Sequence, residues 1–114
     1  MQRTEQAVRV LLCTAPAEKA EALAQALLER RLVACVNEIR GVVSRYRWQD
    51  ALQKDTESLL VLKTDAARLD ALARAVTELH PYDVPELLAL PVEAGLGPYC
   101  DWVKTETLLP DAGA

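Results

Sequence analysis

One histidine and three cysteines are the side chains of this 114-residue chain best suited to hold a soft metal ion. Imidazole and thiolate groups are the ligands that copper and zinc prefer. Cys13, Cys35 and His80 are therefore the candidate metal ligands, with copper or another divalent cation as the candidate ion. The competing interpretation is structural: a histidine at a helix C-terminus interacts with the helix dipole and a loop carbonyl, and a free cysteine is most often a small buried hydrophobe. No second ligand lies close to His80 in sequence, which favours the structural interpretation.

A second group of side chains lies around the ends of the predicted strands. Lys63 ends an apolar run, Tyr82 and Glu86 flank a proline-constrained turn, and Tyr99 and Trp102 lie near the C-terminus. A cation, the imidazole of His80, a phenol and a carboxylate that converge there would bind a small anion or metabolite in a cleft. Aromatic residues at a subunit boundary more often pack than bind, so a hydrogen-bonded network at an interface is the favoured interpretation. Asp55 and Glu57 are assigned to capping or solubilising the chain before the third strand.

Catalytic signatures are absent from the sequence. It contains no GxGxxG, P-loop, GxSxG or HExxH motif. Cys100 is expected to be the most exposed thiol, but no cysteine has an adjacent histidine or basic cluster that would lower its pKa and make it a nucleophile. We therefore expect that the protein is not an enzyme, although a site assembled between subunits would leave no local motif.

Hydrophobic periodicity predicts the elements that position these groups. Strands are expected at 8–13, 34–47, 58–63 and 86–91, and helices at 16–31, at 66–79 and from about 98 onward. Thr14 is the candidate N-cap of the first helix, and Thr64 or Asp65 that of the second. Gly41 predicts a bulge or bend in the second strand, and 49–51 a turn.

The order strand, helix, strand, strand, helix, strand predicts an α+β fold of ferredoxin-like βαββαβ topology. Right-handed crossovers place the first and third strands side by side at the centre of an antiparallel sheet, with two helices on one face. The two most apolar strands, 8–13 and 58–63, are the ones that this topology buries. A short C-terminal helix completes the single domain 1–114, in which 1–7 and 109–114 are expected to be flexible ends.

Composition narrows the class of protein. Hydrophobic residues make up 51% of the chain and Phe is absent, which predicts an aliphatic core. A formal net charge of −4 argues against nucleic-acid binding, which needs a surplus of Lys and Arg. The first six residues have no apolar run typical of a secretory signal, and no stretch is long enough for membrane insertion. Three widely spaced cysteines suggest a reducing compartment, so we expect a cytoplasmic location.

The second strand predicts an oligomer. The segment 35–48 is about twice the usual strand length of 5–6 residues, so its distal half, with the start of the third strand, must overhang a domain of this size. That hairpin leaves edge amides and the side chains of Val42, Val43, Tyr46 and Trp48 in water unless a partner chain covers them. The alternative is an unpaired, flexible hairpin that is stabilised by its arginines.

Several local patterns follow one another along the chain: LCTAP at 12–16, ACVN at 34–37, Gly41-Val42, SRY at 44–46 with Trp48, LKT at 62–64, HPYDVPE at 80–86, LPV at 90–92, and Tyr99 with Trp102. Together they resemble the CutA divalent-cation tolerance family over about 8–108. Three positions depart from the family pattern. Asp50 stands where a hairpin glycine is usual, Arg40 stands where proline is frequent, and Cys100 stands where an aliphatic residue is usual.

The resemblance implies a homotrimer in which long hairpins pair edges between subunits, similar in architecture to the PII signalling trimers. It implies a role in divalent-cation (copper) tolerance, with weak binding of copper or another divalent metal. One alternative is a PII-like sensor or adaptor that binds a small anion or an unknown protein partner in the clefts between subunits. Another is a purely structural trimer.

Overall fold

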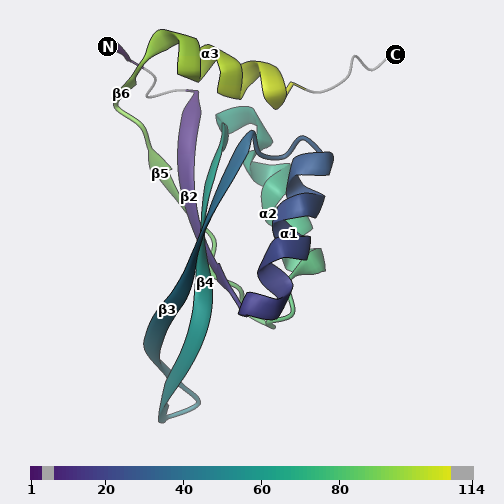
Figure 1. Cartoon of the computed structure of the whole chain (residues 1–114), viewed down its shortest axis with the longest axis vertical. Helices are drawn as coiled ribbons and strands as arrows, with labels where there is room; N and C mark the ends of the chain where they lie inside the picture. Colours follow the sequence, from purple (N-terminus) through teal and green to yellow (C-terminus); the bar gives the residue numbers. More distant parts are fainter. Residues whose placement is uncertain (4–6, 109–114) are drawn as a thin grey trace.

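A four-stranded antiparallel sheet with two helices on one face forms the body of the protein, in the computed structural model shown in Figure 1. The structure describes residues 1–3 and 7–108. The strands of this sheet are β2 (Val8–Ala15), β3 (Cys35–Trp48), β4 (Ala51–Asp65) and β5 (Leu88–Pro91), in the spatial order β3-β4-β2-β5. The helices are α1 (Ala17–Glu29), α2 (Leu69–Leu79), preceded by the 3₁₀ turn η1 (Ala66–Arg68), and α3 (Gly97–Glu106).

This arrangement confirms the ferredoxin-like α+β fold. Each neighbouring pair of strands is antiparallel, and β2 and β4, the two apolar strands, occupy the centre as expected. The edges belong to the arginine-bearing strand β3 and to the proline-flanked strand β5. In the described part of the chain, no helix is long and apolar enough to cross a membrane.

A two-residue strand pair, absent from the sequence prediction, lies beside the main sheet. β1 (Gln2–Arg3) pairs with β6 (Ala94–Gly95), so part of the segment 1–7 that was expected to be flexible forms backbone pairs. Residues 4–6 and the expected flexible end 109–114 lie outside the described residues. The domain limits therefore stay a prediction.

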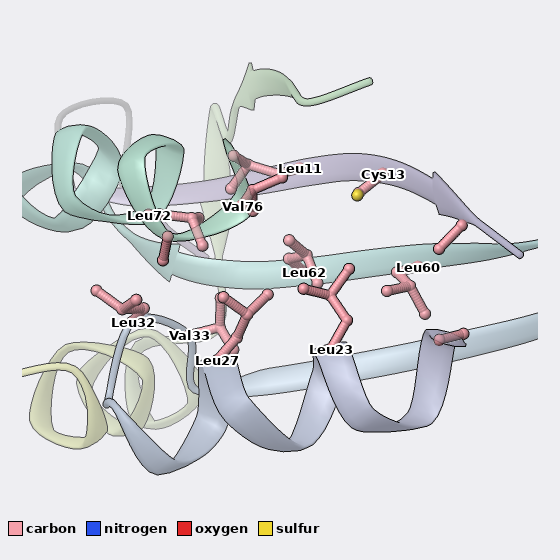
Figure 2. Packing of buried hydrophobic residues seen from close by; sticks show 13 residues of the cluster. Leu11, Cys13, Leu23, Leu27, Leu32, Val33, Leu60, Leu62, Leu72 and Val76 are labelled. Carbon is pink, nitrogen blue, oxygen red and sulfur yellow. The ribbon is translucent and has the colours of Figure 1, made fainter. Parts of the chain in front are cut away.

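The core between the sheet and the two helices is aliphatic, as the composition indicates. Alternation along β2 and β4 turns Leu11 and Cys13 from one strand and Leu60 and Leu62 from the other toward the helices. Figure 2 shows these side chains meeting those of α1, α2 and the α1–β3 connection. Full burial of one such leucine stabilises the fold by roughly 1.5–3 kcal/mol.

The ends of the helices differ in part from the sequence prediction. The carboxylate of Asp65 accepts the Ala67 N–H at 2.8 Å, which resolves the cap of the second helix in favour of Asp65. Thr64 instead donates its hydroxyl to the Leu32 carbonyl at 2.7 Å. Thr14 as the cap of α1 is wrong, because β2 continues to Ala15 and Pro16 takes the N-cap position without a side-chain hydrogen bond.

A smaller apolar cluster lies under α3. Val8, Cys100 and Val103 are buried together, and Cys100 is 7% exposed. The expectation of a partly exposed Cys100 is therefore wrong, since its helix turns it onto Val8, the first residue of β2. A Cβ at Gly95 would lie 2.7 Å from the Cys100 sulfur, so this close approach requires a glycine.

The hairpin of β3 and β4 extends well beyond the rest of the sheet (Figure 1). Its two-residue turn has φ of +49° at Gln49 and +64° at Asp50, the left-handed pair of a type I′ connection. The register shifts by one residue between Ile39 and Val42, where Gly41 has φ of +75°. The predicted turn and the predicted bulge are both confirmed.

Candidate functional site

A cavity of about 640 Å³ lies between the hairpin and the loop that follows α2. The hairpin contributes Ser44, Arg45, Tyr46, Trp48 and Glu57. The loop contributes Pro81, Tyr82, Asp83, Val84 and Glu86, and Thr14 lines the cavity at the end of β2. The volume lies within the 300–1,000 Å³ range of small-molecule sites.

Strand register explains why these side chains meet. Val42 pairs with Glu57, and Ser44 and Tyr46 follow it at intervals of two residues, so all of them share one face of the hairpin. Thr14 pairs with Leu59, two residues from Glu57, and therefore lies on the same face. This is the face opposite the one that Cys13 and Leu60 turn toward α1 and α2.

Glu57 is the most deeply placed charge in the cavity, with 5% of its surface exposed. Its Oε2 accepts the hydroxyl of Tyr82 at 2.8 Å, which joins β4 to the loop after α2. Burial and the charge of Glu57 raise the pKa of Tyr82, so the phenol stays protonated at physiological pH. Within the described residues, Oε1 of Glu57 accepts no protein hydrogen bond, and because no fully buried side-chain oxygen there lacks a partner, this atom is reached by solvent.

A second phenol–carboxylate pair lies further out on the hairpin. Tyr46 donates its hydroxyl to Asp55, and this hydrogen bond is the first cause of its raised pKa. Both tyrosine hydroxyls are thus engaged, and Tyr46, Tyr82 and Trp48 all line the cavity.

The charge of the cavity is negative. Glu57, Asp83 and Glu86 line it, opposed by the single guanidinium of Arg45. Three carboxylates against one cation favour a positively charged occupant over an anion.

Cys13 lies behind this cavity, within the helix-facing core. Burial, with smaller contributions from the negative charges of Glu86 and Glu57, raises the pKa of its thiol from 9.0 to about 11. The thiol contacts the Thr14 carbonyl at 3.8 Å. A buried thiol with a raised pKa is a poor ligand until a cation displaces its proton.

His80, which is 6% exposed, uses both ring nitrogens within the fold. The Tyr82 N–H donates to Nδ1 at 3.1 Å, so Nε2 carries the proton and donates to the Thr14 carbonyl at 2.8 Å. The contact with a main-chain carbonyl is the one that the structural interpretation expects. Binding a metal through either nitrogen would break one of these bonds.

The three candidate metal ligands do not converge within one subunit. Cys13 pairs with Leu60 and Cys35 pairs with Lys63, and because residues three apart on β4 point to opposite faces, the two thiols lie on opposite sides of the sheet. Among residues 1–3 and 7–108, no three His, Cys, Asp or Glu side chains are grouped so that they could hold a metal ion. A preformed three-ligand site is thus absent from the described chain.

The predicted cleft group divides into two. Tyr82 and Glu86 line the cavity, whereas Lys63 lies beside Cys35, with its Nζ 3.9 Å from the sulfur. Tyr99 lies beside the same thiol. The pKa of its phenol is raised first by burial, then by the charge of Cys35 and by a hydrogen bond to Cys35. The ring of Trp102 is 5.6 Å from that of Tyr99. Lys63 is six residues along β4 from Glu57, roughly 20 Å away.

Sequence reasoning missed the cavity roles of Glu57, Asp83 and Arg45. Glu57 was assigned to capping or solubilising the hairpin because a charged residue before an apolar strand usually faces solvent. Its partner, Tyr82, is 25 residues away in the chain, so no local spacing signals the pair.

Known proteins resemble this chain in sequence. The sequence pattern of the family described as "CutA1 divalent ion tolerance protein" matches residues 9–106. The divalent-cation tolerance protein CutA of Thermus thermophilus is 46% identical over 99 residues, which cover 86% of this chain and 96% of that protein. Human protein CutA is 43% identical over 101 residues, which cover 88% of this chain but 56% of the human protein, so the chain spans little more than half of that relative.

Solved structures of CutA proteins have the same fold as this chain. CutA from Synechococcus elongatus superposes with a TM-score of 0.87 at 38% identity, covering 93% of this chain and 94% of that one. The protein described as PII-like protein CutA from Nostoc, in apo form, has a TM-score of 0.85 at 36% identity, covering 90% and 99%. None of these names is that of an enzyme.

The expectation of a cytoplasmic location does not hold. The Arabidopsis thaliana relative, 39% identical over 86% of this chain and 54% of its own length, is named chloroplastic. A CutA structure from Archaeoglobus fulgidus, with 31% identity, a TM-score of 0.85 and coverage of 89% and 99%, is described as periplasmic. Relatives of this sequence thus occur in several compartments, and three unpaired cysteines do not fix the compartment.

Proposed function

The chain belongs to the CutA1 family of divalent ion tolerance proteins, and on that basis we propose that it acts as a homotrimer that binds divalent cations weakly at the cavity below the hairpin. The observation that carries the proposal is the charge of the cavity: three carboxylates, including the buried Glu57, face one guanidinium. An exchangeable cation, rather than a resident cofactor, fits a cavity without a preformed set of three ligands.

Copper is the cation that we propose, with the carboxylates of Glu57 and Glu86, which both line the cavity, as its first ligands. Cys13 lies on the opposite face of the sheet, within the helix-facing core, and takes no part in this site. Among divalent first-row metals, copper binds a given set of ligands most tightly. Two carboxylates without a nitrogen or sulfur ligand keep the affinity low.

The exposed apolar surface supports the homotrimer. Ile39, Val43, Leu88 and Leu90 are each between 46% and 57% exposed on the two edge strands, a larger share than isolated surface residues explain. Strands β3 and β5 are the ends of the sheet in the described chain and offer unpaired edges to a neighbour. We place the hairpin residues Val42, Val43, Tyr46 and Trp48 beside neighbouring subunits.

The alternative reading, a PII-like adaptor that binds a small anion, has less support, because the acidic cavity would repel an anion. We propose a role without catalysis, since the cavity aligns no activated nucleophile: the Cys13 thiol is protonated and both nitrogens of His80 are engaged.

Calorimetric titration with copper tests the proposal. The trimer should bind copper saturably, and Glu57→Gln and Glu86→Gln should each weaken the copper affinity at least about tenfold. Glu21→Gln, which removes an exposed carboxylate from α1, is the matched control and should change nothing. Unchanged affinity in both cavity variants would show that the assigned ligands are wrong.

A further inference from the structure

Three polar side chains surround the sulfur of Cys35, on the face of the sheet opposite α1 and α2. Cys35 pairs with Lys63 across β3 and β4, and the Lys63 Nζ lies 3.9 Å from Sγ. The side-chain oxygen of Asn37 accepts from this ammonium group, and the thiol donates to the same oxygen at 3.9 Å. Tyr99, from α3, lies beside the thiol. The cluster thus brings an amine and a thiol into contact.

Strand register explains why the amine stays beside the sulfur. Directly opposed residues of an antiparallel pair have Cβ atoms roughly 4.5–5.5 Å apart, so a lysine side chain can fold back to a sulfur on the neighbouring strand. Asn37 lies two residues along β3 from Cys35 on the same face, and its hydrogen bond holds the Lys63 nitrogen there. Because 28 residues separate Cys35 from Lys63 in the sequence, no local motif signals the contact.

Cys35 is also the cysteine that solvent reaches best within one subunit. Cys13 and Cys100 are buried, whereas Cys35 is only partly buried. Among the described residues, Lys63 is the only lysine whose ammonium group contacts a sulfur atom. Val42, the nearest hairpin residue that we place beside a neighbouring subunit, is seven residues further along β3, roughly 20 Å away. Cysteines that react with peroxides are accessible and lie beside cationic side chains, as Cys35 does.

We infer that Cys35 and Lys63 form a reversible sulfenamide cross-link, a covalent bond between Sγ and Nζ, when the protein is exposed to hydrogen peroxide. The sulfur first attacks the peroxide: an S–O bond forms, the O–O bond breaks, and water leaves. The amine, after losing one proton to solvent, then attacks the sulfenic acid. The S–N bond forms, the S–O bond breaks, and the oxygen leaves as water with a second proton from nitrogen.

The electrons balance over these two steps. Sulfur loses two electrons, and one peroxide molecule is reduced to two molecules of water. An external thiol reverses the cross-link, because it reduces the sulfur and is itself oxidised to a disulfide. The S–N bond also removes the sulfenic acid before a second peroxide can oxidise it irreversibly to sulfinic acid. This inference goes beyond the proposed metal function and does not depend on it, since it uses neither the cavity nor a metal ion.

Hydrogen peroxide treatment of the assembled protein with excess EDTA, followed by tryptic peptide mapping, tests the inference. Trypsin cuts after Lys and Arg, so the cross-link should join the peptide 32–40 to the peptide 55–68, which stays uncut after Lys63. The joined species should be about 2 Da lighter than the sum of the two peptides, because two hydrogen atoms are lost. Dithiothreitol should separate them again.

Lys63→Arg should abolish the cross-link, because a guanidinium group stays protonated and does not attack the sulfenic acid. Cys35 should then be labelled by dimedone, a reagent that traps sulfenic acids. Lys54→Arg changes an exposed lysine on the same strand and is the matched control, which should keep the cross-link. Glu57→Gln should also keep it, which separates this inference from the metal proposal.

Three results would overturn the inference. A Cys35 left unmodified by peroxide would show that its thiol does not react in the assembled protein. Equal dimedone labelling of the wild type and Lys63→Arg would show that Lys63 does not capture the sulfenic acid. A joined peptide that retains one oxygen atom would show that sulfur and nitrogen are not directly bonded.

Discussion

Tyr82 and Glu57, from the loop after α2 and from β4, are joined by a 2.8 Å hydrogen bond in which the phenol donates to a carboxylate that is 5% exposed. This bond holds the loop against the hairpin and fixes the carboxylate at the inner end of the cavity. The position of the loop wall of the cavity therefore depends on that of the hairpin wall.

Tyr82→Phe should lower the free energy of unfolding by about 1–3 kcal/mol, because it leaves a buried carboxylate without its donor. Urea denaturation at pH 7 measures the change. Tyr46→Phe is the matched control: its partner Asp55 is exposed, so water replaces the lost donor and the effect should stay below about 1 kcal/mol. Equal effects in the two variants would contradict the role given to the burial of Glu57.

The raised thiol pKa of Cys13 predicts that the folded protein loses stability at alkaline pH. Its thiol has a pKa of about 11 in the fold against an ordinary value of 9.0. Between these values the folded chain binds more protons than the unfolded chain, so the free energy of unfolding falls as pH rises. Urea denaturation of the wild type and of Cys13→Ala across pH 8–11 should show a steeper fall in the wild type. Parallel curves would exclude a raised thiol pKa.

The hairpin turn offers a stabilising substitution. Asp50 has φ of +64°, a conformation that is unfavourable for residues with a Cβ and accessible to glycine. Asp50→Gly should raise the free energy of unfolding by up to about 1 kcal/mol, as measured by thermal or urea denaturation. Asp101→Gly, on helix α3, should instead lower it by roughly 0.3 kcal/mol. A loss of stability in Asp50→Gly would mean that the Asp side chain supports the turn.

His80 should exist as the neutral tautomer with its proton on Nε2. The Tyr82 amide occupies Nδ1 and the Thr14 carbonyl accepts from Nε2. Long-range proton–nitrogen NMR spectra at neutral pH measure the tautomer directly, and the single histidine removes any ambiguity of assignment. A proton found on Nδ1 would contradict the hydrogen-bond directions described for this corner.

The exposed edge of β5 predicts an effect on assembly. Leu90 is 46% exposed at the edge of the sheet, so Leu90→Lys should place a charge in the proposed subunit interface and lower the mass measured by analytical ultracentrifugation. Leu28→Lys, at 38% exposure on the outer side of α1, is the control and should leave the mass of a trimer unchanged. A wild-type protein that sediments as a single subunit would refute the trimer itself.

The fold could be predicted from the sequence because its signals are local. Apolar runs at 8–13 and 58–63 and helical spacing at 66–79 require only neighbouring residues to be read. The strand pair β1–β6 was missed because two-residue strands have no periodicity. Thr14 was misassigned as a cap because β2 runs two residues past the apolar run, a length set by its pairing with β4.

The candidate site could be predicted only in part. Tyr82 and Glu86 were identified from the constrained turn around them, and both line the cavity. Cys13 and Cys35 were grouped by chemistry, but the alternation of side chains across the sheet separates them, and that separation depends on register. Glu57 was missed because its burial results from a contact with a residue in another element.

Gly41 has a consequence for the ligand chemistry of the whole hairpin. The extra residue at the bulge advances the odd–even alternation of β3 by one, so that Val42, Ser44 and Tyr46 lie on the side of Glu57. A ladder that continued from the Ile39–Leu59 pair without a bulge would instead pair Gly41 with Glu57 and exchange the two sides of the distal strand. Arg47 would then join Arg45 beside Glu57 in place of Tyr46 and Trp48, and a cavity suited to cations would become lined with guanidinium groups. A single backbone insertion thus sets the sign of the charge that the hairpin can receive.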